Sequence, residues 1–147
     1  MKTLVLVLMA CGPGPAYHYA TPCFDLDSEV ELDQRTLERD TEAAAALVDG
    51  FFRDGQFCRS MRRTHVTVRG AEWSCPGMKP GGCIGYFNSF SGIDLNETGK
   101  ALVHESLHLR DADRLCPGTA WHEGWETNGY NFLDDRFREH VKTWRMQ

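Results

Sequence analysis

The sequence predicts one small α+β domain with an N-terminal helix, a short mixed β-sheet, a second helix and a C-terminal helix. Three observations support this class. Apolar residues recur at helical spacing in three stretches, β-branched residues alternate with others between the first two stretches, and Pro/Gly-containing turns separate the segments. The chain has 147 residues, of which 41% are hydrophobic and 25% charged, so it fits one compact domain with a real core.

The first helix is expected to begin after Asp33, a residue type that caps helix N-termini. The alanine run at 43–46 raises helix propensity, and the glycines at 50 and 55 indicate where the helix ends. Its apolar stripe follows the spacing i, i+4, i+7, i+11 and i+14: Leu37, Thr41, Ala44, Val48 and Phe51.

The sheet is expected to form from three short segments. Residues 64–69 alternate and are rich in β-branched side chains, so they predict a strand. Residues 83–88 and 92–95 predict two more strands, which a Ser/Gly turn joins.

Two further helices are expected in the C-terminal half. Asn96 is a candidate cap for a helix that runs to about residue 115 and stops at the Pro-Gly pair 117–118. A final helix is expected from about residue 121 to about residue 144. The side chains that share its face are polar at first and then apolar: His122, Glu126, Tyr130, Leu133, Phe137, Val141 and Trp144.

Residues 104–108, with the sequence His-Glu-Ser-Leu-His, carry the chemistry. His104 and His108 are four residues apart, so on a helix they share a face and can bind one metal ion. Glu105 lies one residue along, where it reaches a metal-bound water without being a ligand itself. That position suits a general base, because zinc lowers the pKa of bound water towards 7.

With this motif the chain resembles the zincin metallopeptidases, and within them the small SprT-like and gluzincin-like forms. The resemblance covers the helix, sheet, helix, helix order from about residue 33 to 144, and its specific part is residues 104–108. It implies one catalytic Zn²⁺ per chain. It also implies that an edge strand before the motif helix, here residues 84–88 or 93–95, binds an extended peptide substrate.

The third metal ligand distinguishes the zincin subfamilies. A metzincin-like pattern would need Gly and His or Asp at the positions of Asp111 and Arg114, so that pattern fails. His122 is the favoured ligand, as in families whose third histidine opens the following helix. Glu126 would give a gluzincin-like arrangement, and Glu123 is a further alternative.

Two residues near the expected metal site, Tyr130 and Asp111, have more than one interpretation. Tyr130 shares the expected face of His122, so it could donate a hydrogen bond to a tetrahedral oxyanion; a buried structural tyrosine is the favoured alternative. Asp111 lies one turn beyond His108, where it is either a helix-end residue or a carboxylate that orients a histidine. Trp125 is expected to serve as packing.

The N-terminus has the order of an export signal. Residues 1–10 combine a lysine with a short apolar run and form the predicted signal peptide. Cys11 follows in a context similar to a bacterial lipobox, which predicts that it carries lipid. Residues 11–24 are rich in Gly and Pro and are expected to tether a catalytic domain at 25–147.

Six cysteines after a signal-like start predict disulfides in an oxidising compartment. Cys75 and Cys83 flank a Pro/Gly loop and are the expected pair. Cys23, Cys58 and Cys116 are left unassigned.

These features predict an exported zinc peptidase that hydrolyses peptide bonds with metal-activated water and Glu105 as general base. The expected partner is a peptide or protein, and the membrane is contacted only through the lipid anchor. The net charge of −5 argues against nucleic acid. The alternative is a catalytically inactive, metal-binding envelope lipoprotein that acts as a binding module.

Overall fold

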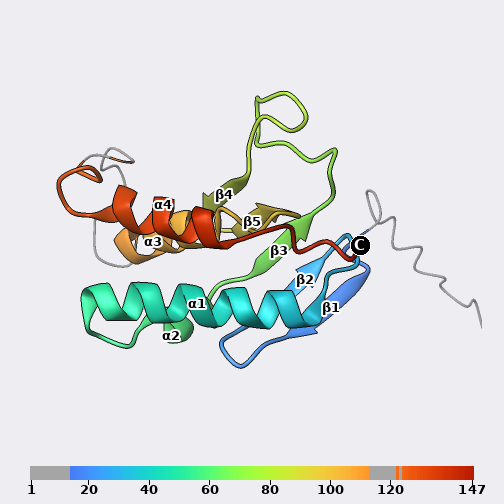
Figure 1. Cartoon of the computed structure of the whole chain (residues 1–147). Helices are drawn as coiled ribbons and strands as arrows, with labels where there is room; N and C mark the ends of the chain where they lie inside the picture. The colour runs from blue at the N-terminus through green and yellow to red at the C-terminus, as the bar shows by residue number, and fades with distance from the viewer. Residues whose placement is uncertain (1–13, 113–121, 123) are drawn as a thin grey trace, which may run out of the picture.

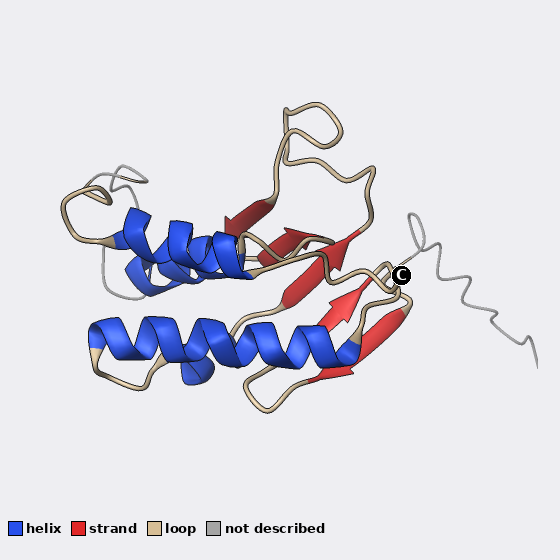
Figure 2. Cartoon of the chain, in the orientation of Figure 1, coloured by secondary structure: helices blue, strands red, loops and turns tan. Residues whose placement is uncertain are grey.

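A computed structural model describes residues 14–112, 122 and 124–147, and it confirms the α+β class (Figure 2). Five strands and four helices form in this part of the chain. In chain order they are β1 (Tyr17–Ala20), β2 (Asp25–Ser28), α1 (Gln34–Phe52), α2 (Phe57–Met61), β3 (Val66–Arg69), β4 (Gly85–Asn88), β5 (Gly92–Asn96), α3 (Leu102–Ala112) and α4 (Tyr130–His140).

The strands form one mixed sheet in the order β1-β2-β3-β5-β4. β3 pairs in parallel with β2 and β5, while β1 with β2 and β4 with β5 are antiparallel pairs. The expected hairpin of β4 and β5 is therefore confirmed. Of the two candidate edge strands, β4 lies at the edge and β5 lies inside the sheet.

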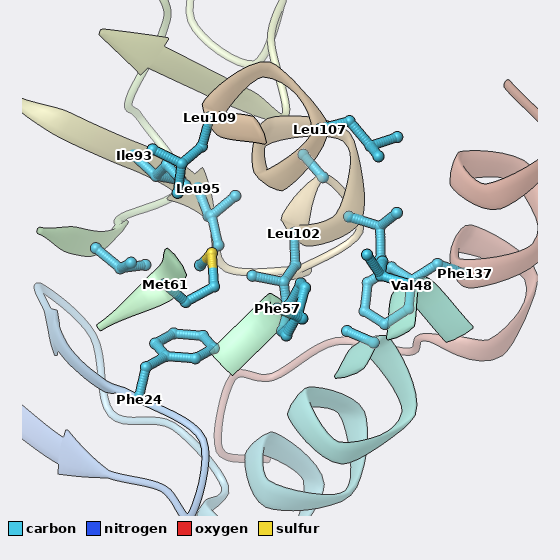
Figure 3. Packing of buried hydrophobic residues seen from close by; sticks show 14 of the residues in the cluster. Phe24, Val48, Phe57, Met61, Ile93, Leu95, Leu102, Leu107, Leu109 and Phe137 are labelled. Atoms are coloured by element: carbon cyan, nitrogen blue, oxygen red, sulfur yellow. The ribbon is translucent and has the colours of Figure 1, made fainter. Parts of the chain in front are cut away.

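The core lies between the sheet and the helices. α1 runs alongside α3 and α4, and the strands stand at one end of this helical layer (Figure 1). Alternate residues of β5, Ile93 and Leu95, are buried, as are Val66 and Val68 of β3. Figure 3 shows such side chains meeting residues of α1, α3 and α4 in one cluster, which fixes α3 against the sheet.

α1 forms as its spacing predicts. The Asp33 side chain accepts a hydrogen bond from the Thr36 amide at 2.7 Å, which caps the helix. The expected stripe is buried from Leu37 to Val48. Phe51 departs from it, with 42% exposure, because it lies in the last turn, where it covers Gly129.

The last helix is shorter than expected. α4 begins at Tyr130, not near residue 121, and ends at His140, after which Val141 is extended. His122, Gly124 and Gly129 all have φ between 67° and 85°, a left-handed conformation that a continuous helix cannot contain. The prediction that the C-terminal helix itself carries the third ligand is therefore wrong, because His122 lies in the turns before it.

Two disulfides form among the described residues. The expected Cys75–Cys83 bond is confirmed, and a second bond joins Cys23 to Cys58. Both are consistent with an oxidising, extracellular setting. Cys116 lies outside the described residues.

The N-terminal segment is only partly covered by the structure. The predicted signal peptide at 1–10 and Cys11 lie outside the described residues. Within the predicted tether, Tyr17–Ala20 forms β1, and Cys23 and Phe24 are buried, so the folded domain begins before residue 25. In the described part of the chain, none of the helices has the length and apolar character needed to cross a membrane.

Candidate metal centre

α3 presents the two histidines of the motif on one face. Leu102, Val103 and Leu107 are fully buried on its other faces, so the helix cannot turn its histidines elsewhere without exposing the core. His108 is 6% exposed, while His104 is half-buried. The motif therefore lies at the boundary between the core and an open surface.

His122 completes a group of three. Its Nε2 atom lies 3.0 Å from Nε2 of His108 and 3.0 Å from Nε2 of His104, and the latter two atoms are 3.2 Å apart. The three predicted ligands are thus brought together, although His122 comes from an exposed turn rather than a helix. Within the described residues, this is the group of side chains that could hold a metal ion.

The positions of the three Nε2 atoms are better explained by a shared cation than by hydrogen bonds between the rings. Each Nε2 carries at most one hydrogen, so three such atoms in mutual contact cannot satisfy all three contacts as hydrogen bonds. Three nitrogens bound to one ion at about 2.0–2.1 Å would lie at about the separations observed. One cation facing three lone pairs removes the conflict.

Asp134 of α4 orients His104. The Nδ1–H group of His104 donates to Oδ2 of Asp134 at 2.8 Å, which leaves Nε2 of His104 directed at the other histidines. Oδ1 of Asp134 accepts a hydrogen bond from Nε of Arg138 at 2.8 Å. Burial tends to raise the pKa of Asp134, but these two partners outweigh it and keep the pKa below its ordinary value.

Sequence reasoning missed Asp134 and considered Asp111 for such a role. Asp111 instead accepts a hydrogen bond from the Tyr130 hydroxyl at 2.8 Å. The sequence gives only a weak signal for Asp134. It lies one turn after Tyr130 on the expected helix, but it also lies four residues before Arg138, and that spacing is typical of a solvent-exposed ion pair.

Glu105 is buried next to the histidines, with 4% exposure. Burial is the main cause that raises the pKa of its carboxyl group to about 7; the charge of His104 opposes the shift and that of Asp134 adds to it. Gly85 of β4 passes so close that a Cβ atom there would lie 2.8 Å from Oε1 of Glu105. The edge strand and the carboxylate are therefore in direct contact, and only glycine leaves room for both.

Two of the three histidines, His108 and His122, favour the neutral form that binds metals. Burial, followed by the charges of His104 and His122, lowers the pKa of His108 to about 3. Burial and the charge of His104 also lower the pKa of His122. Both rings consequently offer lone pairs at neutral pH.

A cleft of about 390 Å³ opens over this group. Its walls are the three histidines, Glu105 and residues of the edge strand: Gly85, Tyr86 and Phe87. The expectation that an edge strand borders the motif helix is met by β4.

Within the described residues, none of the remaining sequence candidates belongs to the group of three histidines. Glu126 is exposed and is not part of the group, and Glu123 lies outside the described residues. Tyr130 is 6% exposed and donates its hydroxyl hydrogen to Asp111, which supports the structural alternative for this residue. Trp125 is buried against the imidazoles, as expected for packing.

A scan against models of known protein families, a search of curated proteins and a search of solved structures found no match to this chain.

Proposed function

We propose that this protein is a zinc-dependent peptidase, with His104, His108 and His122 as the metal ligands. The observation that supports it most directly is the buried Glu105 carboxylate beside three converging imidazole nitrogens, at the floor of a cleft. Three neutral imidazoles suit zinc, and sites with three protein ligands keep a position for water or substrate. A zinc ion held there would supply Lewis acidity and make a water molecule acidic near neutral pH.

Glu105 and Asp134 have separate roles in the proposed reaction. Glu105 takes a proton from the attacking water as the new C–O bond forms at the peptide carbonyl. It then delivers that proton to the amine nitrogen as the C–N bond breaks. Asp134 keeps the proton of His104 on Nδ1 throughout, so Nε2 of that ring stays available to the metal.

The substrate is proposed to bind in an extended conformation along β4. In the described part of the sheet, β4 pairs with β5 on one side and no strand pairs with its other side. Its backbone groups can therefore add a peptide strand by β-augmentation, which places the peptide over the cleft. Tyr86 and Phe87 line the same cleft and would contact substrate side chains.

We also propose that the enzyme works outside the cytoplasm, attached to the bacterial envelope by lipid on Cys11. Two disulfides and the signal-like N-terminus support export.

The test is hydrolysis of a general peptide library by the wild type and by Glu105→Gln, read by mass spectrometry. The wild type should cleave peptides in a chelator-sensitive manner. Glu105→Gln should retain zinc but lose about 100-fold or more of the rate, because it removes the general base. Zinc binding without cleavage by the wild type would reject the peptidase and favour the alternative, a metal-binding module.

A further inference from the structure

The indole of Trp125 lies against all three histidines at once. Its ring centroid is 4.7 Å from that of His104, 4.7 Å from that of His108 and 4.7 Å from that of His122. The imidazole centroids are 4.7–5.0 Å from one another. The three imidazole centroids form a triangle. Because the indole centroid is equally distant from all three, it lies on the axis that passes through the centre of this triangle.

The indole occupies the side of this axis that faces away from the cleft. Trp125 is 2% exposed, and it is not among the residues that line the cleft over the histidines. The cleft side holds Glu105 and β4 instead. Among the described residues, the three imidazoles therefore have a buried apolar ring on one side and an open cleft on the other.

Trp125 is itself supported from beneath. The ring of Tyr130 meets the indole edge-on at a centroid distance of 5.3 Å, and its hydroxyl group is held by Asp111. Tyr130 in turn packs against Phe52 of α1 at 5.7 Å. This aromatic stack connects the indole to two helices, so Trp125 has little freedom to move away from the histidines.

We propose that Trp125 is a positioning residue for the metal centre: it holds the three imidazoles in their converging arrangement and closes the rear of the site to water. This inference rests on the proposed metal site. The need for such a support is greatest at His122, which lies in an exposed turn with φ of 67°. Because Trp125 closes the rear, the approach that the described residues leave open to water and substrate is the cleft beside Glu105.

Two expectations follow for metal binding. Removing the ring should weaken affinity by about 10-fold to 100-fold, the loss typical when a residue that orients metal ligands is removed. A paramagnetic ion such as Co²⁺ should also quench the emission of Trp125, because the indole contacts all three ligand rings. A residue with only a structural role elsewhere in the fold would change neither quantity.

The experiment is a titration with Co²⁺ and Zn²⁺, using full-length wild type, Trp125→Ala, Trp125→Phe and one control, Trp73→Phe. The control alters a partly exposed tryptophan in the loop after β3, away from the histidines. We expect Trp125→Ala to bind weakly, Trp125→Phe to recover part of the affinity, and Trp73→Phe to bind like the wild type. Co²⁺ quenching should persist in Trp73→Phe and be largely lost in Trp125→Phe.

The outcomes separate this inference from the proposed function. A wild type that binds neither ion would reject the metal site itself. A wild type that binds metal, with wild-type affinity in Trp125→Ala or undiminished quenching in Trp125→Phe, would overturn the role of Trp125 alone. If Trp125→Ala does not fold, the quenching difference between Trp125→Phe and Trp73→Phe still decides.

Discussion

At the scale of single residues, the centre depends on which nitrogen of each ring is free. His104 is the best-defined case, because the Asp134 carboxylate accepts the Nδ1 hydrogen and so leaves Nε2 as the atom that faces the other two histidines. Arg138 keeps that carboxylate charged and in place. The orientation of His104 on α3 is thus set by a salt-bridged pair on α4.

Replacing Asp134 by Asn tests this orientation. An amide can present its NH₂ group to His104 and disrupt the hydrogen bond, so we expect metal affinity to fall by about 10-fold to 100-fold. Competition with a metal-sensitive dye measures the change. Asp135→Asn is the matched control, because Asp135 is the exposed neighbour on the same helix, and equal affinities for the two variants would refute the role of Asp134.

At the scale of elements, the C-terminal segment after α4 fastens α1 to the loop that enters α3. Trp144 is fully buried, and its Nε1–H group donates to Oδ2 of Asp40 on α1 at 2.9 Å. Its backbone amide donates to the Glu97 carbonyl oxygen at 2.9 Å. Gly99 packs directly on the indole, where a side chain would collide. This contact fixes the approach to the motif helix.

Trp144→Phe should therefore destabilise the fold. It leaves a fully buried Asp40 oxygen without its indole donor, which costs about 1–3 kcal/mol. Chemical denaturation of the variant beside the wild type measures this difference in the free energy of unfolding. Trp73→Phe, at a partly exposed position, should change stability by less than about 0.5 kcal/mol. Equal losses of stability in Trp144→Phe and Trp73→Phe would contradict this role of the Trp144 indole.

The elements also show what could be predicted from sequence. α1 has apolar spacing that matches the face it buries, so its position was predicted well. α3 begins at Leu102, later than expected, because the candidate cap Asn96 is the last residue of β5 and accepts hydrogen bonds from Thr98 instead. β1 and β2 were missed, because sequences such as that of Asp25–Ser28 are polar on the face away from the helices and resemble a loop. The start of α4 was misplaced, because side chains at helical spacing continue through glycines with left-handed backbone.

Some residues of the candidate site could likewise be predicted from the sequence, and others could not. His104, Glu105, His108 and His122 carry their own signal in residue type and spacing, and the structure brings the histidines together. Asp134 and the position of Trp125 under the rings depend on how α4 and its preceding turns pack on α3. That packing is a tertiary property, which local patterns do not contain.

At the scale of the whole molecule, ion pairs of Arg69 connect neighbouring strands of the sheet. Arg69 of β3 donates from Nη1 to Glu29 beside β2, and from Nε to Asp94 of β5, both at 2.8 Å. Burial tends to raise the pKa of Glu29, but hydrogen bonds from the Gly70 amide and from Arg69 outweigh it and lower the pKa below its ordinary 4.5. Three strands are thus connected across the sheet.

This network makes stability depend on pH in a defined direction. Because the pKa of Glu29 is lower in the folded chain than in the unfolded chain, its contribution is complete above the unfolded pKa and is lost as the pH falls through the folded pKa. Glu29→Gln should be less stable than the wild type by about 0.5–1 kcal/mol at pH 7, since the group is partly exposed. Unfolding curves should converge below about pH 4; a gap that widens on acidification would contradict the assignment.

The metal content of the purified protein tests the central claim most directly. Prepared without chelators, the wild type should contain one zinc ion per chain. His122→Ala should lose more than about 100-fold in affinity, beyond the loss expected for a residue that only orients a ligand, while Glu126→Ala should bind like the wild type. A wild type without bound metal, or a Glu126→Ala variant that loses zinc while His122→Ala retains it, would contradict the three-histidine centre.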